Sequence, residues 1–183
     1  MDRASVVALL EERGAASIEH PGGTLLAHVG RVAELLAAWG AREALVTAGL
    51  AHAVYGTDGF AVSLFGLEDR ARVASVIGPA AESIVYRYAS CDRGSTLGQV
   101  GRQHPVLFRD RFTGADETLR DDELADFAEL TVANEVDLVR QSNQFREAHG
   151  AALATLFAHW QGIVSDAAYA ACLHLDPASG TTR

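Results

Sequence analysis

One stretch of the sequence decides the fold: Leu25-Leu26-Ala27-His28-Val29-Gly30-Arg31-Val32-Ala33-Glu34-Leu35-Leu36. Its apolar residues recur at intervals of three and four, as they do on the buried face of an amphipathic helix. Gly40 is of the residue type that commonly ends a helix, so the pattern predicts a helix over 24–39. His28 lies on the apolar face of that helix and is therefore expected to point inward.

The next predicted helix, over 42–54, carries a second histidine on its apolar face. His52 shares this face with Leu45 and Ala48, and a loop bracketed by glycines follows it, Tyr55-Gly56-Thr57-Asp58-Gly59. A single inward histidine is more often a hydrogen-bonded core residue than a ligand. Two of them on consecutive helices favour a functional site, because facing imidazoles in a helical bundle are a common start of a metal site.

A long helix is predicted from 121 or 122 to about 144. Asn134 and Asp137 lie three residues apart on one of its faces, whereas Glu135 is expected to point elsewhere. Two interpretations of the pair stay open. Asn134 and Asp137 form either a polar notch in a buried face or part of the solvated edge of the helix.

The remaining predicted elements are shorter. We expect helices over 5–13, 68–76, 79–89, 147–160 and 165–173, loops over 14–23 and 90–104, and a strand and turn over 106–116. The sequence thus predicts an all-α helical bundle with at most a small β-hairpin. It is expected to form a single domain over 1–176, followed by a flexible tail over 177–183.

Composition and charge narrow the classes of partner. The chain has 183 residues, of which 49% are hydrophobic, and a formal net charge of -9. This charge argues against nucleic acid or an anionic membrane surface as the main partner. No apolar run is long enough to span a bilayer, the N-terminus does not read as a signal peptide, and two cysteines are too few for a disulfide framework. A cytoplasmic protein is therefore expected.

The two histidine helices resemble the HD-domain superfamily over about 24–58, and residues 131–138 resemble it more weakly. Members are helical bundles that bind one or two metals through a His on one helix, a His-Asp pair ending the next, and an Asp on a later helix. Here these segments match His28, Leu50-Ala51-His52-Ala53 and Val132-Ala133-Asn134-Glu135-Val136-Asp137. The loop after His52 is also similar to the RelA/SpoT-type branch, in which acidic residues serve pyrophosphate hydrolysis. Asp58 is the acidic residue of that loop here.

Two positions depart from the superfamily pattern. Ala53 replaces the Asp of the pair, and Asn134 occupies one alignment of the final Asp, with Asp137 nearly one turn further on. The resemblance then implies a metal set of His28, His52 and Asp137, which suits a divalent Mn, Fe or Zn ion. If Asn134 is the equivalent residue, metal binding is weak or lost, and the two histidines could act as acid and base in a metal-free pocket.

Several other residues are candidates for contact with a small-molecule substrate. His104, Arg109 and Arg111 form a basic cluster in an otherwise acidic chain, which suits an anionic substrate, although a solvated loop explains each of them alone. Tyr55 and Asn134 could line the pocket, and packing is the alternative for Tyr55.

Three functions follow from these residues. The first is an HD-type metal-dependent hydrolase of a small phosphorylated metabolite or nucleotide, with His28, His52, Asp58 and Asp137 as catalytic residues. The second is a mononuclear non-haem iron oxygenase that uses the same ligands. The third is a metal-free acid–base enzyme or a small-ligand-binding module, as the missing carboxylates suggest. We favour an enzyme, and a hydrolase over an oxygenase, with a homodimer as one possible assembly.

Overall fold

A computed structural model describes residues 2–176 of the chain, and the predicted tail over 177–183 lies outside them. The described part is all-α apart from two small antiparallel hairpins, which confirms the predicted fold class. No helix among residues 2–176 is both long and apolar enough to cross a membrane.

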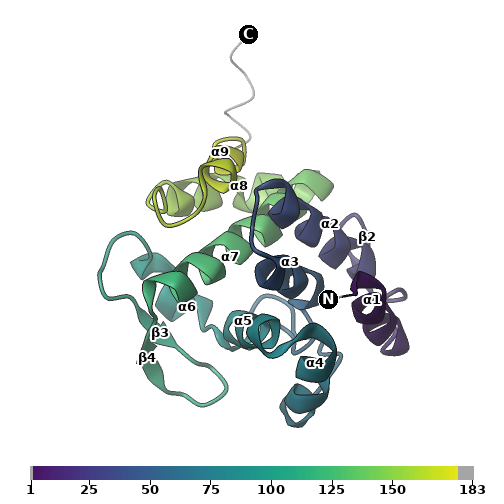
Figure 1. Cartoon of the computed structure of the whole chain (residues 1–183). Coiled ribbons are helices and arrows are strands. Elements are labelled where there is room, and N and C mark those ends of the chain that lie inside the picture. Colours follow the sequence, from purple (N-terminus) through teal and green to yellow (C-terminus); the bar gives the residue numbers. More distant parts are fainter. Residues whose placement is uncertain (1, 177–183) are drawn as a thin grey trace.

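Four helices form the centre of the bundle: α2 (Leu25–Ala38), α3 (Glu43–Ala51), α5 (Pro79–Ser90) and α7 (Asp121–Gln141). Figure 1 shows α7 running through the middle of the molecule, and most of its residues from 127 to 139 are buried. α2 packs against α3 and α7, while α5 packs against α3 and α7 from another side. Residues far apart in the sequence therefore meet around α7.

Local chemistry explains where these helices begin. The hydroxyl of Thr24 accepts a hydrogen bond from the backbone N–H of Ala27 at the start of α2. Three acidic residues occupy the first turn of α7, where the positive end of the helix dipole favours them. Pro79 fits the first turn of α5, where its missing N–H costs nothing. α2 and α3 approach closely at Gly49, where a Cβ atom would lie 2.5 Å from Leu36 Cδ1.

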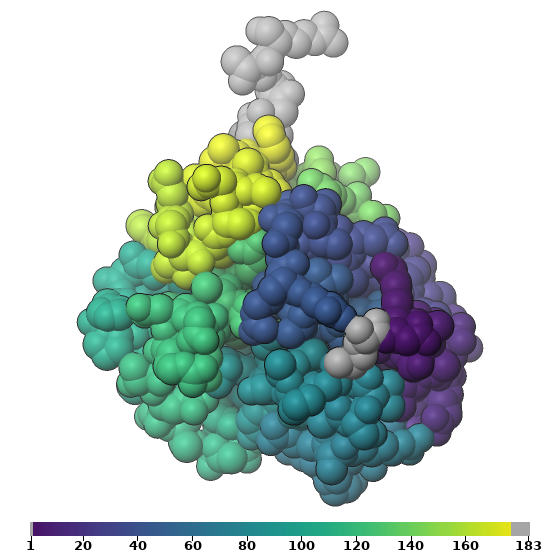
Figure 2. Space-filling view, in the orientation of Figure 1, coloured from purple at the N-terminus to yellow at the C-terminus, as the bar shows by residue number. Residues whose placement is uncertain are grey.

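The other helices surround this centre. One group lies at one end of the bundle and consists of α1 (Arg3–Glu12), the short η1 (Leu67–Asp69) and α4 (Arg70–Ile77). A second group packs against α7 and consists of α8 (Asn143–Phe157) and α9 (Asp166–Cys172). Figure 2 shows one closely packed face, on which α9 (yellow), the α2–α3 region (blue) and α4 (teal) lie next to one another. The segment 90–104, predicted as a loop, contains the short helices α6 (Arg93–Thr96) and η2 (Leu97–Gln99).

The two hairpins differ in how far the sequence predicted them. The hairpin of β3 (Leu107–Arg109) and β4 (Asp116–Thr118) lies where a strand and turn were expected. The hairpin of β1 (Glu19–His20) and β2 (Gly23–Thr24) lies in the predicted loop over 14–23. Its turn is Pro21-Gly22, and the φ of +80° at Gly22 is the conformation that the third position of a type II turn requires. This hairpin places His20 beside α2.

Candidate functional site

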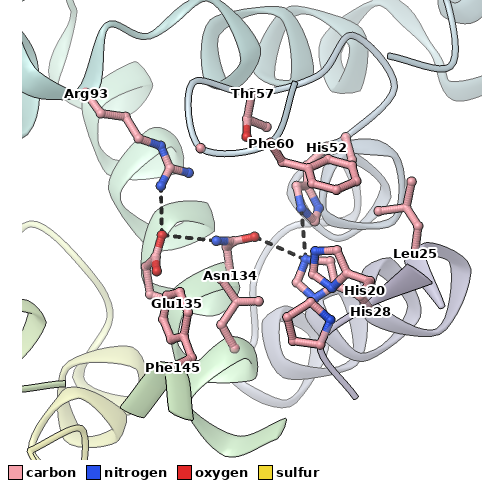
Figure 3. A pocket seen from close by; sticks show the side chains of 14 residues that line it. His20, Leu25, His28, His52, Thr57, Phe60, Arg93, Asn134, Glu135 and Phe145 are labelled. Atoms are coloured by element: carbon pink, nitrogen blue, oxygen red, sulfur yellow. Dashed lines mark hydrogen bonds and ion pairs between the residues drawn. The ribbon is translucent and has the colours of Figure 1, made fainter. Parts of the chain in front are cut away.

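A pocket of about 200 Å³ lies between the β1–β2 turn, α2, the end of α3, the following loop and α7. Three histidines line one side of it, His20, His28 and His52 (Figure 3). Asn134 and Glu135 of α7 face them from the other side, and Arg93 of α6 lies beyond Glu135. The pocket therefore gathers polar groups from five separate elements.

The two histidines predicted from helical periodicity face each other in this pocket. His28 and His52 are 1% and 2% exposed, and their Nε2 atoms are 3.3 Å apart. The rings meet edge to face, with centroids 5.1 Å apart. His52 caps the end of α3, and burial, followed by the charge of His28, lowers the pKa of His52 to about 3. The His52 imidazole is therefore neutral at neutral pH.

Hydrogen bonds on the outer ring nitrogens fix which nitrogen each histidine turns to the pocket. His52 Nδ1 donates to the carbonyl oxygen of Gly49, at 2.8 Å. His28 Nδ1 donates to Asp137 Oδ2, at 2.7 Å. Because both outer acceptors require a hydrogen on Nδ1, a neutral ring carries only a lone pair on Nε2. The Nε2 atoms of both rings point into the pocket, and that of the neutral His52 is an acceptor.

Arg31 holds Asp137 in place. Its guanidinium donates from Nε to Oδ1 and from Nη2 to Oδ2, at 2.7 and 2.9 Å. Burial alone would raise the pKa of Asp137, but the hydrogen bonds from His28 and Arg31 outweigh burial and lower it. Arg31 also donates to the carbonyl oxygens of Pro21 and Gly22 in the β1–β2 turn, at 3.3 and 3.4 Å. One cation thus fixes both the carboxylate behind His28 and the turn that follows His20.

On α7, the amide of Asn134 presents its oxygen to His28. Asn134 Nδ2 donates to Glu135 Oε1 at 3.1 Å, so the amide oxygen Oδ1 is the atom that lies 3.1 Å from His28 Nε2. Glu135 Oε1 also accepts from Arg93 Nη1 at 2.8 Å, and Arg93 Nη2 donates to the Tyr88 hydroxyl at 2.6 Å. A chain of hydrogen bonds therefore fixes the direction in which the Asn134 amide points.

His20 covers the histidine pair from the side of the hairpin. Its ring stacks on His28 with centroids 4.0 Å apart, and it meets Phe60 edge to face at 5.4 Å. Its Nδ1 atom is buried and has no hydrogen-bond partner in the structure. Burial, followed by the charge of His28, lowers the pKa of His20 to about 4. His20 is therefore a neutral ring with a polar atom available for a bound molecule.

The structure does not bring Asp137 to the point where the two Nε2 atoms meet, so we correct the predicted metal set. Asp137 contacts the opposite nitrogen of His28, where it can orient the ring but cannot share an ion with Nε2. Within residues 2–176, no group of three or more His, Cys, Asp or Glu side chains is arranged to hold a metal ion. The atoms that do converge are His28 Nε2, His52 Nε2 and Asn134 Oδ1.

Two predicted residues near His52 lie outside the pocket. The hydroxyl of Tyr55 donates to Glu82 in a separate buried network, at 3.1 Å. Asp58 is exposed, and its carboxylate accepts from the backbone N–H of Arg93, at 3.0 Å. Asp58 thus helps to hold the start of α6 and does not orient water among the histidines.

The predicted basic cluster is also dispersed. Arg109 pairs with Asp116 at 3.0 Å, and Arg111 donates to the carbonyl oxygen of Ala89. His104 lines a different cavity, of about 520 Å³. None of these three side chains lines the histidine pocket.

Three charged residues of the site escaped the sequence prediction. Glu135 lines the pocket although it was expected to point elsewhere, because this part of α7 is buried on several faces. Arg93 was hidden in a predicted loop, and Arg31 was seen only as part of a helix pattern. The signal that could have found Arg31 is its position three residues after His28, on neighbouring turns of the same helix.

Comparison with known proteins adds one match. A family model described as a domain of unknown function (DUF6817) matches residues 9–93, which is less than half of the chain. The matched part contains all three histidines of the pocket and ends at Arg93, whereas Asn134, Glu135 and Asp137 lie outside it. No curated protein and no solved structure matches the chain.

Proposed function

We propose that this chain is an HD-type enzyme that hydrolyses a small molecule in the histidine pocket, using a divalent metal held by His28, His52 and Asn134. One observation carries the proposal: two imidazole nitrogens and an amide oxygen, all of kinds that bind metals, converge there. His52 Nε2 and Asn134 Oδ1 lie 3.3 and 3.1 Å from His28 Nε2. If all three act as acceptors, they need a cation between them, a metal or a proton, because lone pairs repel one another.

The spacing of these atoms fits a metal. Bonds of about 2.0–2.1 Å from an ion to imidazole nitrogens place neighbouring ligand atoms about 3.0–3.4 Å apart. The outer partners also fit, since Asp137 and the Gly49 carbonyl fix the two rings as second-shell groups do in metal sites. Imidazole donors suit zinc or iron better than manganese. Ala53, beside His52, adds no oxygen ligand, so positions stay open for water and substrate.

The residues around the three proposed metal ligands have distinct roles. A bound ion supplies Lewis acidity and lowers the pKa of a bound water. Glu135 places a buried carboxylate in the same pocket, where it can accept a proton from water. Arg93 holds that carboxylate, and Asp137 with Arg31 keeps the His28 ring in one orientation. His20 and Phe60 cover the three proposed metal ligands and limit the access of bulk water to them.

A second candidate is acid–base catalysis without a metal. Asp137 on His28 Nδ1 reproduces the carboxylate–imidazole pair that orients the base in hydrolytic triads. A proton then takes the place of the metal, and His28 Nε2–H donates to Asn134 Oδ1. The iron oxygenase function was suggested by a two-His, one-carboxylate ligand set. Asp137 does not complete such a set around the Nε2 atoms, so we do not propose this function.

Metal analysis of protein purified without added metal separates these candidates. We expect one equivalent of zinc or iron in the wild type and its loss in His28→Ala, His52→Ala and Asn134→Ala. His174→Ala is the matched control, because His174 is exposed and does not line the pocket. A wild type that stays metal-free after incubation with zinc or ferrous ion would overturn the metal proposal and leave acid–base catalysis.

A further inference from the structure

A second cavity, of about 400 Å³, shares a wall with the histidine pocket. Both are lined by Gly59, Arg93, Glu135 and Phe145. The second cavity extends from this wall along α8 to η2 and the middle of α7. The two cavities are therefore neighbouring compartments, and the Arg93–Glu135 pair lies in the wall between them.

The second compartment is mainly apolar. Leu97 of η2 and Leu153, Leu156 and Phe157 of α8 line it together with Phe145. Phe157 is fully buried, and the other four are partly buried against the core. Apart from the shared wall, its polar lining consists of Thr131 and the exposed His149. The apolar part of the lining stabilises hydrocarbon groups that leave water.

The charges in the shared wall compensate each other. Arg93 and Glu135 form an ion pair at 2.8 Å, with side chains 22% and 6% exposed. Behind the histidines, Arg31 pairs with Asp137 at 2.7 Å. Recognition of a phosphate or carboxylate needs a cation that is not already neutralised. Neither of these two arginines meets that condition, and Arg109 and Arg111 line neither cavity. The ion proposed at the histidines would be a free cation, so this argument applies to the α8 compartment and not to the reacting group.

We infer that the substrate is an amphiphile: a polar reacting group lies at the histidines, and an uncharged alkyl or aryl group occupies the α8 compartment. This inference rests on the proposed function in one respect, that the histidine pocket is where the reaction takes place. In the protein without metal, an amide or ester group fits the polar atoms of His20, Asn134 and Glu135.

A ligand series tests the chemistry. The displacement of the neutral fluorescent probe N-phenyl-1-naphthylamine from the full chain is measured with primary carboxamides from propanamide to octanamide. Each methylene buried in the α8 compartment should tighten binding about four-fold. Without metal, hexanamide should bind at least ten-fold more tightly than hexyl phosphate or hexanoate, because Arg93 and Arg31 are already paired with carboxylates. A flat series would overturn the inference.

A pair of alanines on α8 locates the binding. Ala152 lines the apolar compartment and is exposed on the helix, whereas its neighbour Ala151 is also exposed and does not line it. Ala152→Trp should fill the compartment and weaken octanamide binding at least ten-fold, while Ala151→Trp should leave it unchanged. Ala152→Leu gives a milder blockade, with an expected loss of two- to four-fold, should the larger residue prevent folding. Equal affinities in the Ala152 and Ala151 variants would place the probe elsewhere and contradict the inference.

The two proposals fail in distinguishable ways. Amide binding is measured without added metal and depends on the α8 compartment, whereas metal content depends on His28, His52 and Asn134. Graded amide binding in a protein that takes up no metal supports the inference on substrate and rejects the metal. A stoichiometric metal with no graded amide binding supports the metal and rejects the amphiphile.

Discussion

Two buried polar clusters among residues 2–176 differ in how far their hydrogen-bonding groups satisfy one another. In the first, which we term the Glu82 network, every hydrogen bond joins a donor to an acceptor. The hydroxyl of Tyr55 and the guanidinium of Arg70 both donate to Glu82, and the hydroxyl of Tyr86, under the Arg70 guanidinium, donates to Asp110. In the histidine pocket, by contrast, His28 Nε2 converges with two atoms that can only accept, His52 Nε2 and Asn134 Oδ1.

This difference distinguishes a cluster that stabilises the fold from a cluster that can bind a ligand. The Glu82 network links the loop after α3, α4, α5 and the β3–β4 hairpin, and its groups satisfy one another. Such a network stabilises one arrangement of the chain and has no capacity left for a ligand. The histidine pocket keeps its outer hydrogen bonds satisfied and gathers more acceptors than donors at its inner atoms. We therefore expect mutations in the two clusters to act on different measured quantities.

The largest effect on stability is expected from Arg70→Ala. This change leaves the Glu82 carboxylate, 8% exposed, without its main cation. Loss of one partner of a buried pair costs about 3–5 kcal/mol, and we expect about 2–3 kcal/mol because the Arg70 side chain is 40% exposed. Urea unfolding measures the change, and the metal content should not alter.

Arg72→Ala is the matched control for Arg70→Ala. Arg72 lies on the same helix and pairs with Glu12, but both side chains are about half exposed. Its loss should cost at most about 0.5 kcal/mol. If both variants lose the same free energy of unfolding, the Glu82 network contributes no more to stability than an exposed ion pair does.

The second prediction concerns Arg31, which acts on the pocket through other residues. Arg31→Gln removes the charge that holds Asp137 and weakens the contact with the β1–β2 turn. Metal affinity should fall about 10- to 100-fold, as it does when second-shell partners of a ligand are lost. Isothermal titration with zinc measures this fall, and Arg31→Lys should recover part of it. Unchanged affinity in Arg31→Gln would show that the orientation of His28 does not depend on this cation.

A third prediction adds the charge that the ligand set lacks. Asn134→Asp places a carboxylate at the converging atoms, as the HD-type pattern has it. The affinity for zinc should rise at least about ten-fold, because an ionised oxygen binds a cation more strongly than an amide oxygen does. Competition with a chelator gives the value. A fall in affinity would mean that Asn134 Oδ1 does not face the ion.

The smallest effect is expected from Tyr55→Phe. The change removes one neutral donor from Glu82, which keeps both of its bonds from Arg70. The free energy of unfolding should fall by about 0.5–1.5 kcal/mol, with no change in metal or amide binding. Altered binding in a variant of unchanged stability would return Tyr55 to the substrate-contacting role that its position after His52 first indicated.

Helical periodicity predicted the fold and half of the site. It placed His28 and His52 on inward faces because a period of 3.6 residues fixes which side of a helix is buried. It could not tell which ring nitrogen faces the pocket, since that depends on partners as distant as Asp137, 109 positions along the chain from His28.

The charged residues also show that sequence alone does not predict which side chains meet in the folded chain. His104, Arg109 and Arg111 are close in sequence and end on separate contacts, while Arg93 and Glu135, 42 positions apart, form one ion pair in the pocket. Proximity along a chain that turns through a hairpin does not predict proximity in space. On the buried α7, a residue next to the predicted face can also reach the site, as Glu135 does.

The most direct test of the central claim is ¹⁵N NMR of the imidazole nitrogens, with and without one equivalent of zinc. Without metal, we expect His52 to carry its hydrogen on Nδ1 and a bare Nε2. With zinc, the Nε2 signals of both His28 and His52 should move to metal-bound positions while both Nδ1 atoms stay protonated. If zinc leaves both rings unchanged and His28 stays protonated on both nitrogens beside Asp137, the cation between the acceptors is a proton and the metal account is contradicted.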